Sequence, residues 1–304
     1  MKLVKSPLNY TGGKFRLLPQ ILPLFPRNIA TFVDLFCGGG SVGANVRCER
    51  VWFNDINRRL VSLLETFRDS DMSDIMKTIS EVIAKYRLSE SSLYGYQFYG
   101  CDSGKGLGNY NRQSFLNMRS DLNRLDDEGF YYNILLYVTI VYSFNNQIRF
   151  NSKGEFNLPV GKRDFNSKMR VKLEEFVMRL KNLQPMFSSV NFTDFDFDVL
   201  YEEDFVYADP PYLITCASYN ENGGWSREME LRLYNELDRL NERNIRFALS
   251  NLLSSKGKHN ELLEAWLSDR PGYICHHLDY NYSNSNYHTK DRHPIADEVL
   301  ITNY

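Results

Sequence analysis

The sequence predicts an α/β protein whose doubly wound, mainly parallel sheet is interrupted by a long insertion of mostly helical character. The β-rich run TFVDLF at 31–36 breaks at three glycines and is followed by a second buried strand candidate at 51–55. This succession of strand, glycine turn and strand is typical of the opening of a doubly wound domain. Between 57 and 187 the apolar residues recur at helical spacing, and strand candidates resume only afterwards.

These patterns divide the chain into two predicted domains. We expect residues 1–56 and 188–304 to form the sheet domain, and residues 57–187 to form a domain inserted into it. After the glycine turn, Ser41 to Val46 is expected to begin a helix.

The predicted insertion contains helices and one hairpin. LVSLLETF at 60–67 and DIMKTISEVIAKY at 74–86 fit amphipathic helices. The apolar run YYNILLYVTIVYSF at 131–144 fits a buried helix, with a strand as the alternative. A polar and basic stretch near 144–163 is punctuated by glycine and proline, which indicates a hairpin.

Beyond the insertion, the α/β pattern returns. Ser226 is a candidate N-cap for an amphipathic helix over 226–244, which has acidic residues in its first turn. The strand candidates are SVNFTDF at 189–195, DFVYAD at 204–209, IRFALSN at 245–251, YICHHLDY at 273–280 and EVLITNY at 298–304.

Composition favours a cytoplasmic protein without a membrane segment or a metal site. We find no signal-peptide pattern and no apolar run of membrane-spanning length. The five cysteines lack metal-ligand spacing, so we expect reduced thiols at Cys37, Cys48, Cys101, Cys216 and Cys275. The net charge of −2 does not by itself indicate a nucleic-acid partner. Basic residues nevertheless cluster at Arg149, Lys153, Lys162, Arg163, Lys168, Arg170 and Lys172.

The most specific motif is Asp209-Pro210-Pro211-Tyr212, which follows the apolar strand candidate DFVYA. An aromatic amine such as N6 of adenine is a poor nucleophile because its lone pair is delocalised into the ring. The Asp209 carboxylate and the Pro210 carbonyl, which the proline ring holds rigidly, can each accept one of its N–H groups. Tyr212 offers a flat face on which a base can stack. The alternative is a strand-to-loop turn with two prolines and a buried tyrosine.

Two further motifs suit a nucleotide-like cofactor. In Asp34-Leu35-Phe36-Cys37-Gly38-Gly39-Gly40 the glycines let a ligand approach the backbone, and Asp55 can accept hydrogen bonds from ribose hydroxyls. A dinucleotide would need the same geometry, and a tight turn beside a buried acid remains a further alternative. In Asn9-Tyr10-Thr11-Gly12-Gly13-Lys14, the lysine can meet a ligand carboxylate or simply be solvated after a turn.

Taken in order, NYTGGK, DLFCGGG, FND, a long insertion and DPPY resemble the alpha group of DNA adenine-N6 methyltransferases, the D12 class. That group includes the GATC methylases and many restriction-modification methylases. The resemblance covers nearly the full chain. It implies a Rossmann-like methyltransferase fold that binds S-adenosylmethionine, and methyl transfer to N6 of a flipped-out adenine in double-stranded DNA.

The resemblance also implies roles for individual residues. The catalytic residues would be Asp209, Pro210, Pro211 and Tyr212. An acid after the third strand, either Asp194 or Asp196, would meet the cofactor adenine. The other cofactor-binding residues would be Tyr10, Lys14, Asp34, Phe36, Gly38, Gly40, Asp55 and Asp209. Leu35 stands where the family commonly has proline, and Tyr10 where many GATC enzymes have tryptophan.

The stretch near 144–163 resembles the DNA-reading hairpin of this family. Arg149 matches an arginine that contacts guanine, whose O6 and N7 suit a guanidinium. Phe144 matches an aromatic wedge, although it could equally be the core end of the preceding apolar run. The DNA-binding residues implied are Phe144, Asn145, Gln147, Arg149, Asn151, Pro159 and Lys162. Gln147 and Lys162 depart from the GATC pattern, which argues against a GATC target.

Competing hypotheses explain fewer of these motifs. An RNA adenine-N6 or a DNA cytosine-N4 methyltransferase would share the cofactor half, but cytosine-N4 enzymes more often have serine in place of Asp209. A nicotinamide-dependent oxidoreductase explains the glycines and Asp55 but not the DPPY motif or the basic hairpin. A non-catalytic DNA-binding module would be expected to lose the DPPY motif. We expect a monomer that acts in a restriction-modification system beside a restriction endonuclease, with no physical complex implied.

Overall fold

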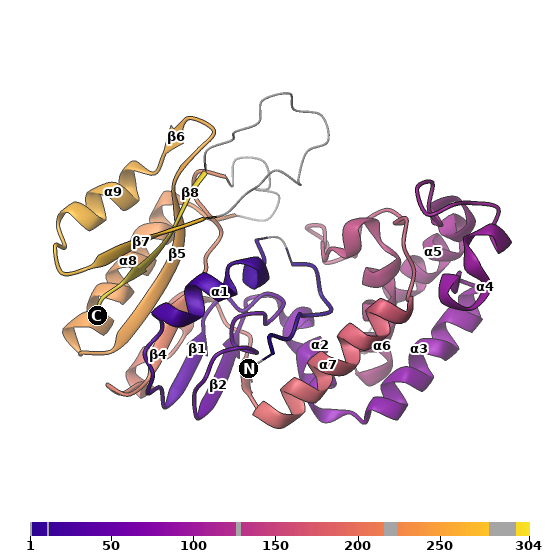
Figure 1. Ribbon diagram of the computed structural model, residues 1–304, viewed down its shortest axis with the longest axis horizontal. Coiled ribbons are helices and arrows are strands. Elements are labelled where there is room, and N and C mark those ends of the chain that lie inside the picture. The colour runs from indigo at the N-terminus through magenta and orange to yellow at the C-terminus, as the bar shows by residue number, and fades with distance from the viewer. Residues whose placement is uncertain (1, 11, 126–128, 216–223, 280–295) are drawn as a thin grey trace. The chain divides into compact units, whose positions relative to one another are not determined.

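The computed structural model describes residues 2–10, 12–125, 129–215, 224–279 and 296–304 (Figure 1). Within these, the chain forms two compact units. Unit 1 comprises residues 1–13, 38–44 and 57–184, and unit 2 comprises residues 14–37, 45–56 and 185–304. Two segments that the sequence analysis assigned to the sheet domain, 1–13 and 38–44, thus group with the insertion.

An eight-stranded sheet organises unit 2, with the strand order β3-β2-β1-β4-β5-β8-β7 and β6 paired to β5. The strands are β1 Thr31–Asp34, β2 Arg50–Asn54, β3 Met186–Ser188, β4 Phe205–Ala208, β5 Arg246–Ser255, β6 Lys258–His259, β7 Ile274–Leu278 and β8 Ala296–Thr302. The pairs among β1 to β5 are parallel, whereas β8 runs antiparallel to both β5 and β7. The predicted α/β fold with a doubly wound sheet is confirmed.

Alternate residues of the central strands pack on opposite faces of this sheet. Val33 of β1 and Val206 of β4 share a core cluster with Leu233 of helix α8, Arg227–Glu242, and Leu263 of helix α9, Glu261–Ser268. The rings of Phe32, Phe205 and Tyr207 instead surround Phe25. Phe25 follows the short helices η1 Lys14–Arg16, α1 Leu18–Ile21 and η2 Leu22–Leu24. Both faces of the central strands are therefore buried, as a parallel sheet requires.

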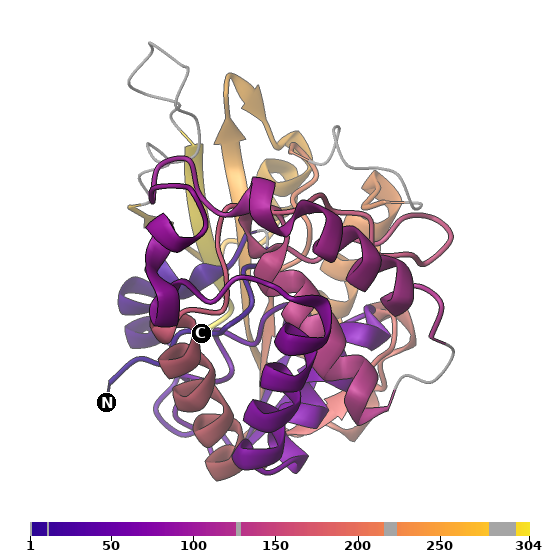
Figure 2. The same ribbon diagram turned by 90° about the vertical axis from the view of Figure 1, so that its right-hand side faces the viewer.

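Unit 1 is mainly helical (Figure 2). Its helices are α2 Arg58–Asp69, α3 Met72–Tyr86, α4 Ser91–Phe98, α5 Gly108–Leu122, α6 Phe130–Tyr142 and α7 Ser167–Leu183. The run at 131–144 is a helix and not the alternative strand: residues 132–142 of α6 are all buried. Helices α2, α3 and α5 pack against α6. Because α6 is apolar around its whole circumference, it has to be covered on several sides.

Two expected elements differ in the structure. Residues 41–46 form turns and loop instead of a helix, since Gly38 and Gly40 adopt φ of +50° and +70°, outside the helical region. The third strand is Met186–Ser188, not 189–195. The Asn191 side chain accepts the backbone N–H of Thr193 and begins the short helix η4, Phe192–Asp194, which ends the extended conformation.

The expectations about membrane segments and cysteines can be compared with the structure only at the described residues. In the part of the chain that the structure describes, we find no helix that could span a membrane. Cys37, Cys48, Cys101 and Cys275 are free thiols. Cys216 and Tyr280, the latter at the end of a strand candidate, lie outside the described residues.

Candidate active site

The strand order of unit 2 reverses between β1 and β4. From β1 the chain continues outward through β2 and β3, and from β4 it continues through β5 in the opposite direction. In doubly wound sheets ligands bind beyond the carboxyl ends of the strands at such a switch point. Asp34 is the last residue of β1, and Asp209 directly follows β4. Two predicted site residues, Asp34 and Asp209, therefore lie at the carboxyl ends of the two strands that flank the switch point.

Lys14 and the DPPY motif meet in one buried cluster of unit 2. The Lys14 Nζ lies 2.8 Å from Oδ1 of Asp209, with Lys14 only 4% exposed. The Tyr212 hydroxyl donates to the same Oδ1 at 3.1 Å. The ammonium also lies over the Tyr212 ring, 4.9 Å from its centroid. Lys14 was expected either to meet a ligand carboxylate or to be solvated, and here its ammonium contacts a protein carboxylate.

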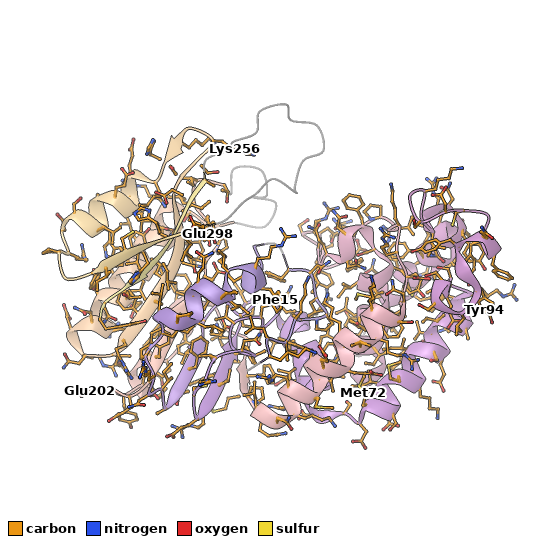
Figure 3. All side chains as sticks on the ribbon, in the orientation of Figure 1. Phe15, Met72, Tyr94, Glu202, Lys256 and Glu298 are labelled. Atoms are coloured by element: carbon orange, nitrogen blue, oxygen red, sulfur yellow. The ribbon has the colours of Figure 1, made fainter. Side chains whose placement is uncertain are left out.

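A fourth member of this cluster, Glu298 of β8, was missed by the sequence analysis. Its Oε1 lies 3.5 Å from Lys14 Nζ and 3.2 Å from the Tyr212 hydroxyl, and its side chain is 3% exposed. Figure 3 labels Glu298 on β8 and Phe15 in η1, the short helix that Lys14 begins. The only signal in the sequence was an acid opening the apolar strand candidate EVLITNY.

The two carboxylate oxygens of Asp209 have different environments. The ammonium of Lys14 and the hydroxyl of Tyr212 both have Oδ1 as their nearest oxygen of Asp209. The side chain remains 18% exposed. Burial raises the pKa of the Asp209 carboxyl, Lys14 opposes the increase, and the Glu298 charge adds to it. One oxygen is thus anchored and the other can accept a hydrogen bond from a ligand.

Acidic side chains also mark the carboxyl ends of β1 and β2. Asp34 and Asp55 are buried, and both are close enough to the Cys37 thiol to raise its pKa, after the larger effect of burial. The neighbouring Asn54, not noticed in the sequence, ties these strand ends together. Its amide donates to the carbonyls of Leu35 and Val190 at 3.0 and 3.1 Å.

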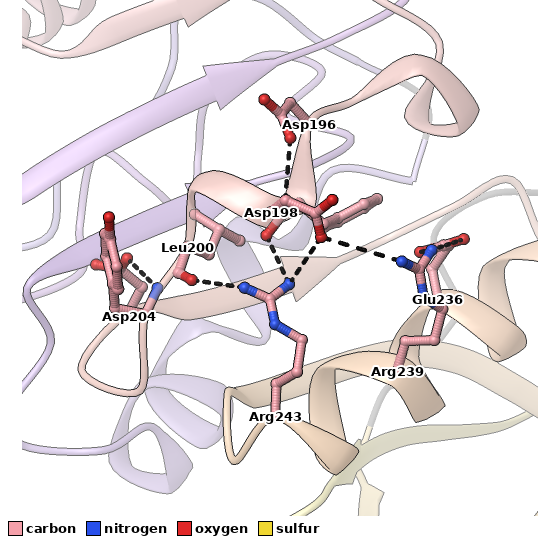
Figure 4. Close-up of polar contacts among 9 residues, drawn as sticks. Asp196, Asp198, Leu200, Asp204, Glu236, Arg239 and Arg243 are labelled. Carbon is pink, nitrogen blue, oxygen red and sulfur yellow. Dashed lines mark hydrogen bonds and ion pairs between the residues drawn. The ribbon is translucent and has the colours of Figure 1, made fainter.

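The two acids after β3 differ in their partners (Figure 4). The Asp196 carboxylate accepts the backbone N–H of Asp198 at 3.1 Å and caps the short helix η5, Phe197–Val199. Asp198 lies 3.5 Å from Arg243, which also donates to the carbonyl of Leu200. Asp194 and Asp196 are both exposed. Geometry leaves both as candidates for a cofactor contact.

Phe36 forms an aromatic corner in unit 2. Its ring centroid lies 5.5 Å from that of Phe192 and 5.6 Å from that of Trp225, in an edge-on contact with the latter. Buried Glu230 accepts from the indole N–H of Trp225 and, at 2.6 Å, from the hydroxyl of Tyr234. Hydrogen bonds within the core therefore hold Trp225 in place.

The glycine turn and Tyr10 belong to unit 1, where they lie against each other. A Cβ added to Gly38 would lie 2.7 Å from Cδ1 of Tyr10, so only glycine permits this approach of the ring. A Cβ on Gly39 would meet the Ser6 hydroxyl at 3.2 Å. Gly40 has φ of +70°.

The predicted hairpin is an irregular ribbon in unit 1. Antiparallel bridges join Ser143 to Val160 and Phe150 to Phe156. The Asn151 side chain accepts from the backbone N–H groups of Lys153 and Glu155 at 3.0 and 2.9 Å, so it stabilises the turn. Among the predicted DNA-binding residues Phe144, Asn145, Arg149, Pro159 and Lys162 are exposed, and Gln147 and Asn151 are half-buried.

Two of these exposed side chains are informative. Phe144 is 48% exposed, which excludes the alternative that it ends the core run. Arg149 Nε donates to Oδ1 of Asn157 at 2.7 Å across the ribbon, so its guanidinium is oriented although exposed. Among the described residues no group of three or more His, Cys, Asp or Glu side chains could hold a metal ion.

Residues 10–284 match the family model of the D12 class N6 adenine-specific DNA methyltransferases. The chain belongs to this family. The matched range contains the Lys14–Asp209–Tyr212 cluster, the glycine turn and the hairpin. Membership of the D12 class rules out the alternative of a nicotinamide-dependent oxidoreductase.

Named relatives of this D12 chain include modification methylases and a type II methyltransferase. It is 40% identical over 309 residues to "Modification methylase StsI" of Streptococcus sanguinis, a match covering 100% of this chain and 43% of that protein. It is 41% identical over 307 residues to "Type II methyltransferase M.FokI" of Planomicrobium okeanokoites, covering 99% of this chain and 43% of that protein. "Modification methylase LlaI" of Lactococcus lactis is 30% identical over 308 residues, covering 99% and 43%. The chain therefore spans less than half the length of these curated relatives.

Proposed function

We propose that this chain transfers the methyl group of S-adenosylmethionine to N6 of a flipped-out adenine in double-stranded DNA. The observation that carries the proposal is the asymmetry of Asp209. Lys14 and Tyr212 both bind Oδ1, which orients the carboxylate so that Oδ2 can accept a hydrogen bond from a ligand. An exocyclic amine needs such an anchored acceptor, because accepting its N–H makes the nitrogen lone pair more available.

The residues that act on the adenine are Asp209, Pro210 and Tyr212. Asp209 Oδ2 accepts one N–H of the amine, and the rigid Pro210 carbonyl accepts the other. The adenine stacks on Tyr212, on the ring face away from the Lys14 ammonium. Pro211 keeps the loop after β4 from continuing the strand. A base inside a duplex cannot reach this site, so the adenine must leave the stack.

The residues present fit S-adenosylmethionine. Buried acids at the ends of β1 and β2, Asp34 and Asp55, suit the ammonium and ribose hydroxyls of such a molecule. Phe36 offers aromatic surface for its adenine, and Tyr10, Gly38 and Gly40 of unit 1 are the other proposed cofactor-binding residues. One of Asp194 and Asp196 would bind the adenine amine. When bound, S-adenosylmethionine supplies the methyl group that is transferred.

Recognition of the DNA sequence is assigned to the ribbon near 144–163. Its exposed Arg149, oriented by Asn157, suits the O6 and N7 of a guanine. Phe144 is exposed, as an aromatic wedge into the duplex would have to be. Bases or phosphates would also be contacted by the polar side chains of Asn145, Gln147 and Lys162. Pro159 would contribute van der Waals contacts to the DNA. Asn151 contributes by holding the turn.

We propose that the enzyme works as a monomer in a restriction-modification system. Two relatives with "modification methylase" in their names and one named "Type II methyltransferase" support this context. A restriction endonuclease of the same system would share the DNA sequence and need not bind the chain.

The experiment that tests this function uses purified protein, labelled S-adenosylmethionine and plasmid DNA, followed by single-molecule sequencing to map methylated bases. We expect N6-methyladenine in one sequence context. Methylation of cytosine, or of RNA oligonucleotides in preference to duplex DNA, would support the cytosine-N4 or the RNA alternative instead. No methylation of any of these substrates would overturn the proposal.

A further inference from the structure

Glu298 is the one member of the Lys14 cluster to which the proposed function gives no task. It comes from β8, whereas Asp209 and Tyr212 lie in the loop after β4. We propose that Glu298 is a positioning residue, which acts through Lys14 and Tyr212 to keep the Asp209 carboxylate a strong acceptor for the target amine. This inference rests on the proposed function.

The first step of the argument is charge. One buried ammonium faces two carboxylates, Asp209 at 2.8 Å and Glu298 at 3.5 Å. If Glu298 were neutral, the Lys14 ammonium would interact more strongly with Asp209, and a buried ion pair draws the negative charge of Asp209 toward the ammonium. With both carboxylates ionised, the three groups keep one net negative charge, and Asp209 remains a better hydrogen-bond acceptor.

The second step is the Tyr212 hydroxyl, which lies between the two carboxylates. It is 3.1 Å from Asp209 Oδ1 and 3.2 Å from Glu298 Oε1, yet it has a single proton to donate. The hydroxyl therefore donates to one carboxylate at a time and links the two. Glu298 thereby helps to hold the orientation of the ring on which the base is proposed to stack.

The third step is rigidity. Glu298 stands in a strand paired on both sides, opposite Leu252 of β5 and Leu278 of β7. Tyr212 lies in a loop outside the sheet. A contact with a doubly paired strand fixes a loop side chain more firmly than contacts within the loop would. Glu298 is thus held rigidly enough to orient Tyr212 of the DPPY motif, and Glu298 need not touch the substrate.

The test compares Glu298→Gln, which keeps the shape and removes the charge, with Asp297→Asn as a matched control. Asp297 is the neighbouring acid on β8 and pairs with His277 at 2.8 Å. In the free protein, a carbon-13 NMR titration follows the Asp209 carboxyl, whose signal is identified by its loss in Asp209→Asn. We expect Glu298→Gln to lower the pKa of Asp209, because Glu298 raises it by repulsion. Asp297→Asn should leave it unchanged.

Kinetics provide the second readout. Glu298→Gln should slow single-turnover methylation by about tenfold or more while cofactor affinity changes far less, as expected from losing a charged hydrogen-bonding partner. A cycle with Tyr212→Phe and the double variant should be non-additive, because both changes interrupt the same link. A purely structural role would lower stability without moving the pKa of Asp209.

The inference would be overturned if Glu298→Gln kept both the wild-type pKa of Asp209 and the wild-type rate, or if Asp297→Asn changed them equally. Failure of the proposed function is a separate outcome: wild-type protein would then methylate no DNA. The titration needs neither DNA nor cofactor, so in that case it alone would decide whether Glu298 controls Asp209.

Discussion

Lys14 and Asp209 form a 2.8 Å ion pair that joins the first short helix of unit 2 to the loop after its central strand β4. The pair connects two motifs nearly two hundred residues apart in the chain. Because the ammonium and the Tyr212 hydroxyl occupy the same oxygen of Asp209, the pair does more than balance charge. It determines which carboxylate oxygen is available to a substrate.

The first prediction concerns the acceptor itself. Asp209→Asn keeps the shape of the side chain but replaces one acceptor oxygen by a donor. We expect kcat to fall by roughly 10²–10⁴, the loss typical of one preorganised electrostatic partner. Single-turnover methylation of a duplex with 2-aminopurine at the target would separate base flipping, seen as fluorescence, from methyl transfer. Methylation at the wild-type rate by Asp209→Asn would contradict the mechanism.

A second prediction is the pH dependence of the reaction. Burial raises the pKa of Asp209 above its ordinary value, in spite of Lys14. The carboxylate must be ionised to accept the amine, so kcat/KM should fall as the pH decreases through this raised pKa, which lies above that of an exposed aspartate. The same shift means that the folded state holds this proton more readily than the unfolded chain, so ionised Asp209 destabilises the fold above its folded pKa.

The measurement is kcat/KM against pH, which reports groups of the free enzyme. Circular dichroism at each pH would exclude acid unfolding as the cause. An acidic limb at or below the ordinary pKa of aspartate would show that Asp209 is not the titrating acceptor.

The third prediction concerns cofactor binding by Asp55. Asp55→Ala should weaken binding of S-adenosylmethionine by about 1–3 kcal/mol, because the ribose hydroxyls lose an ionised partner. Asp198→Ala is the control, since Asp198 is exposed and pairs with Arg243 on the surface. Calorimetry compares the two variants. Equal affinities for Asp55→Ala and wild type would remove Asp55 from the cofactor site.

A fourth prediction separates sequence recognition from general DNA affinity. Arg149→Ala should relax specificity at one guanine, costing roughly 1–3 kcal/mol of discrimination. Lys168→Ala, in the exposed first turn of α7, should weaken binding to every sequence and reduce its salt dependence. Sequencing of methylated plasmid libraries checks the first variant, and binding at several salt concentrations the second. An unchanged set of methylated sequences with Arg149→Ala would refute its assignment.

The sequence predicted the fold better than the contacts within the candidate site. Periodicity identified β1, β2, β4, β5 and α6 because each is a long or strongly apolar segment. It misplaced the third strand, which is only three residues long and is followed by an Asn191 cap. Glu298 and Asn54 escaped notice because their roles depend on partners that only folding brings near, such as Lys14 and Val190. No local pattern in a single sequence reports such pairings.

The last prediction tests the contact between Tyr10 and the glycine turn. Gly38 has φ of +50°, and a Cβ there would lie 2.7 Å from the Tyr10 ring. Gly38→Ala therefore has two costs: the left-handed conformation, worth about 1–2 kcal/mol, and displacement of the ring. Gly100→Ala has only the first, because Gly100 has φ of +66° and its Cβ would meet nothing within 4 Å. Gly38→Ala should therefore lose more stability in urea unfolding than Gly100→Ala, because the Tyr10 ring must also move.

Cofactor affinity distinguishes the two costs. If Tyr10 binds S-adenosylmethionine, displacing its ring should weaken binding in Gly38→Ala and leave it unchanged in Gly100→Ala. Adding Gly38→Ala to Tyr10→Ala should then weaken binding much less than Gly38→Ala does alone, because the ring that it displaces is already gone. Calorimetry on the four variants measures this coupling. Equal losses of affinity in Gly38→Ala and Gly100→Ala would show that backbone conformation, and not the position of Tyr10, controls the cofactor site.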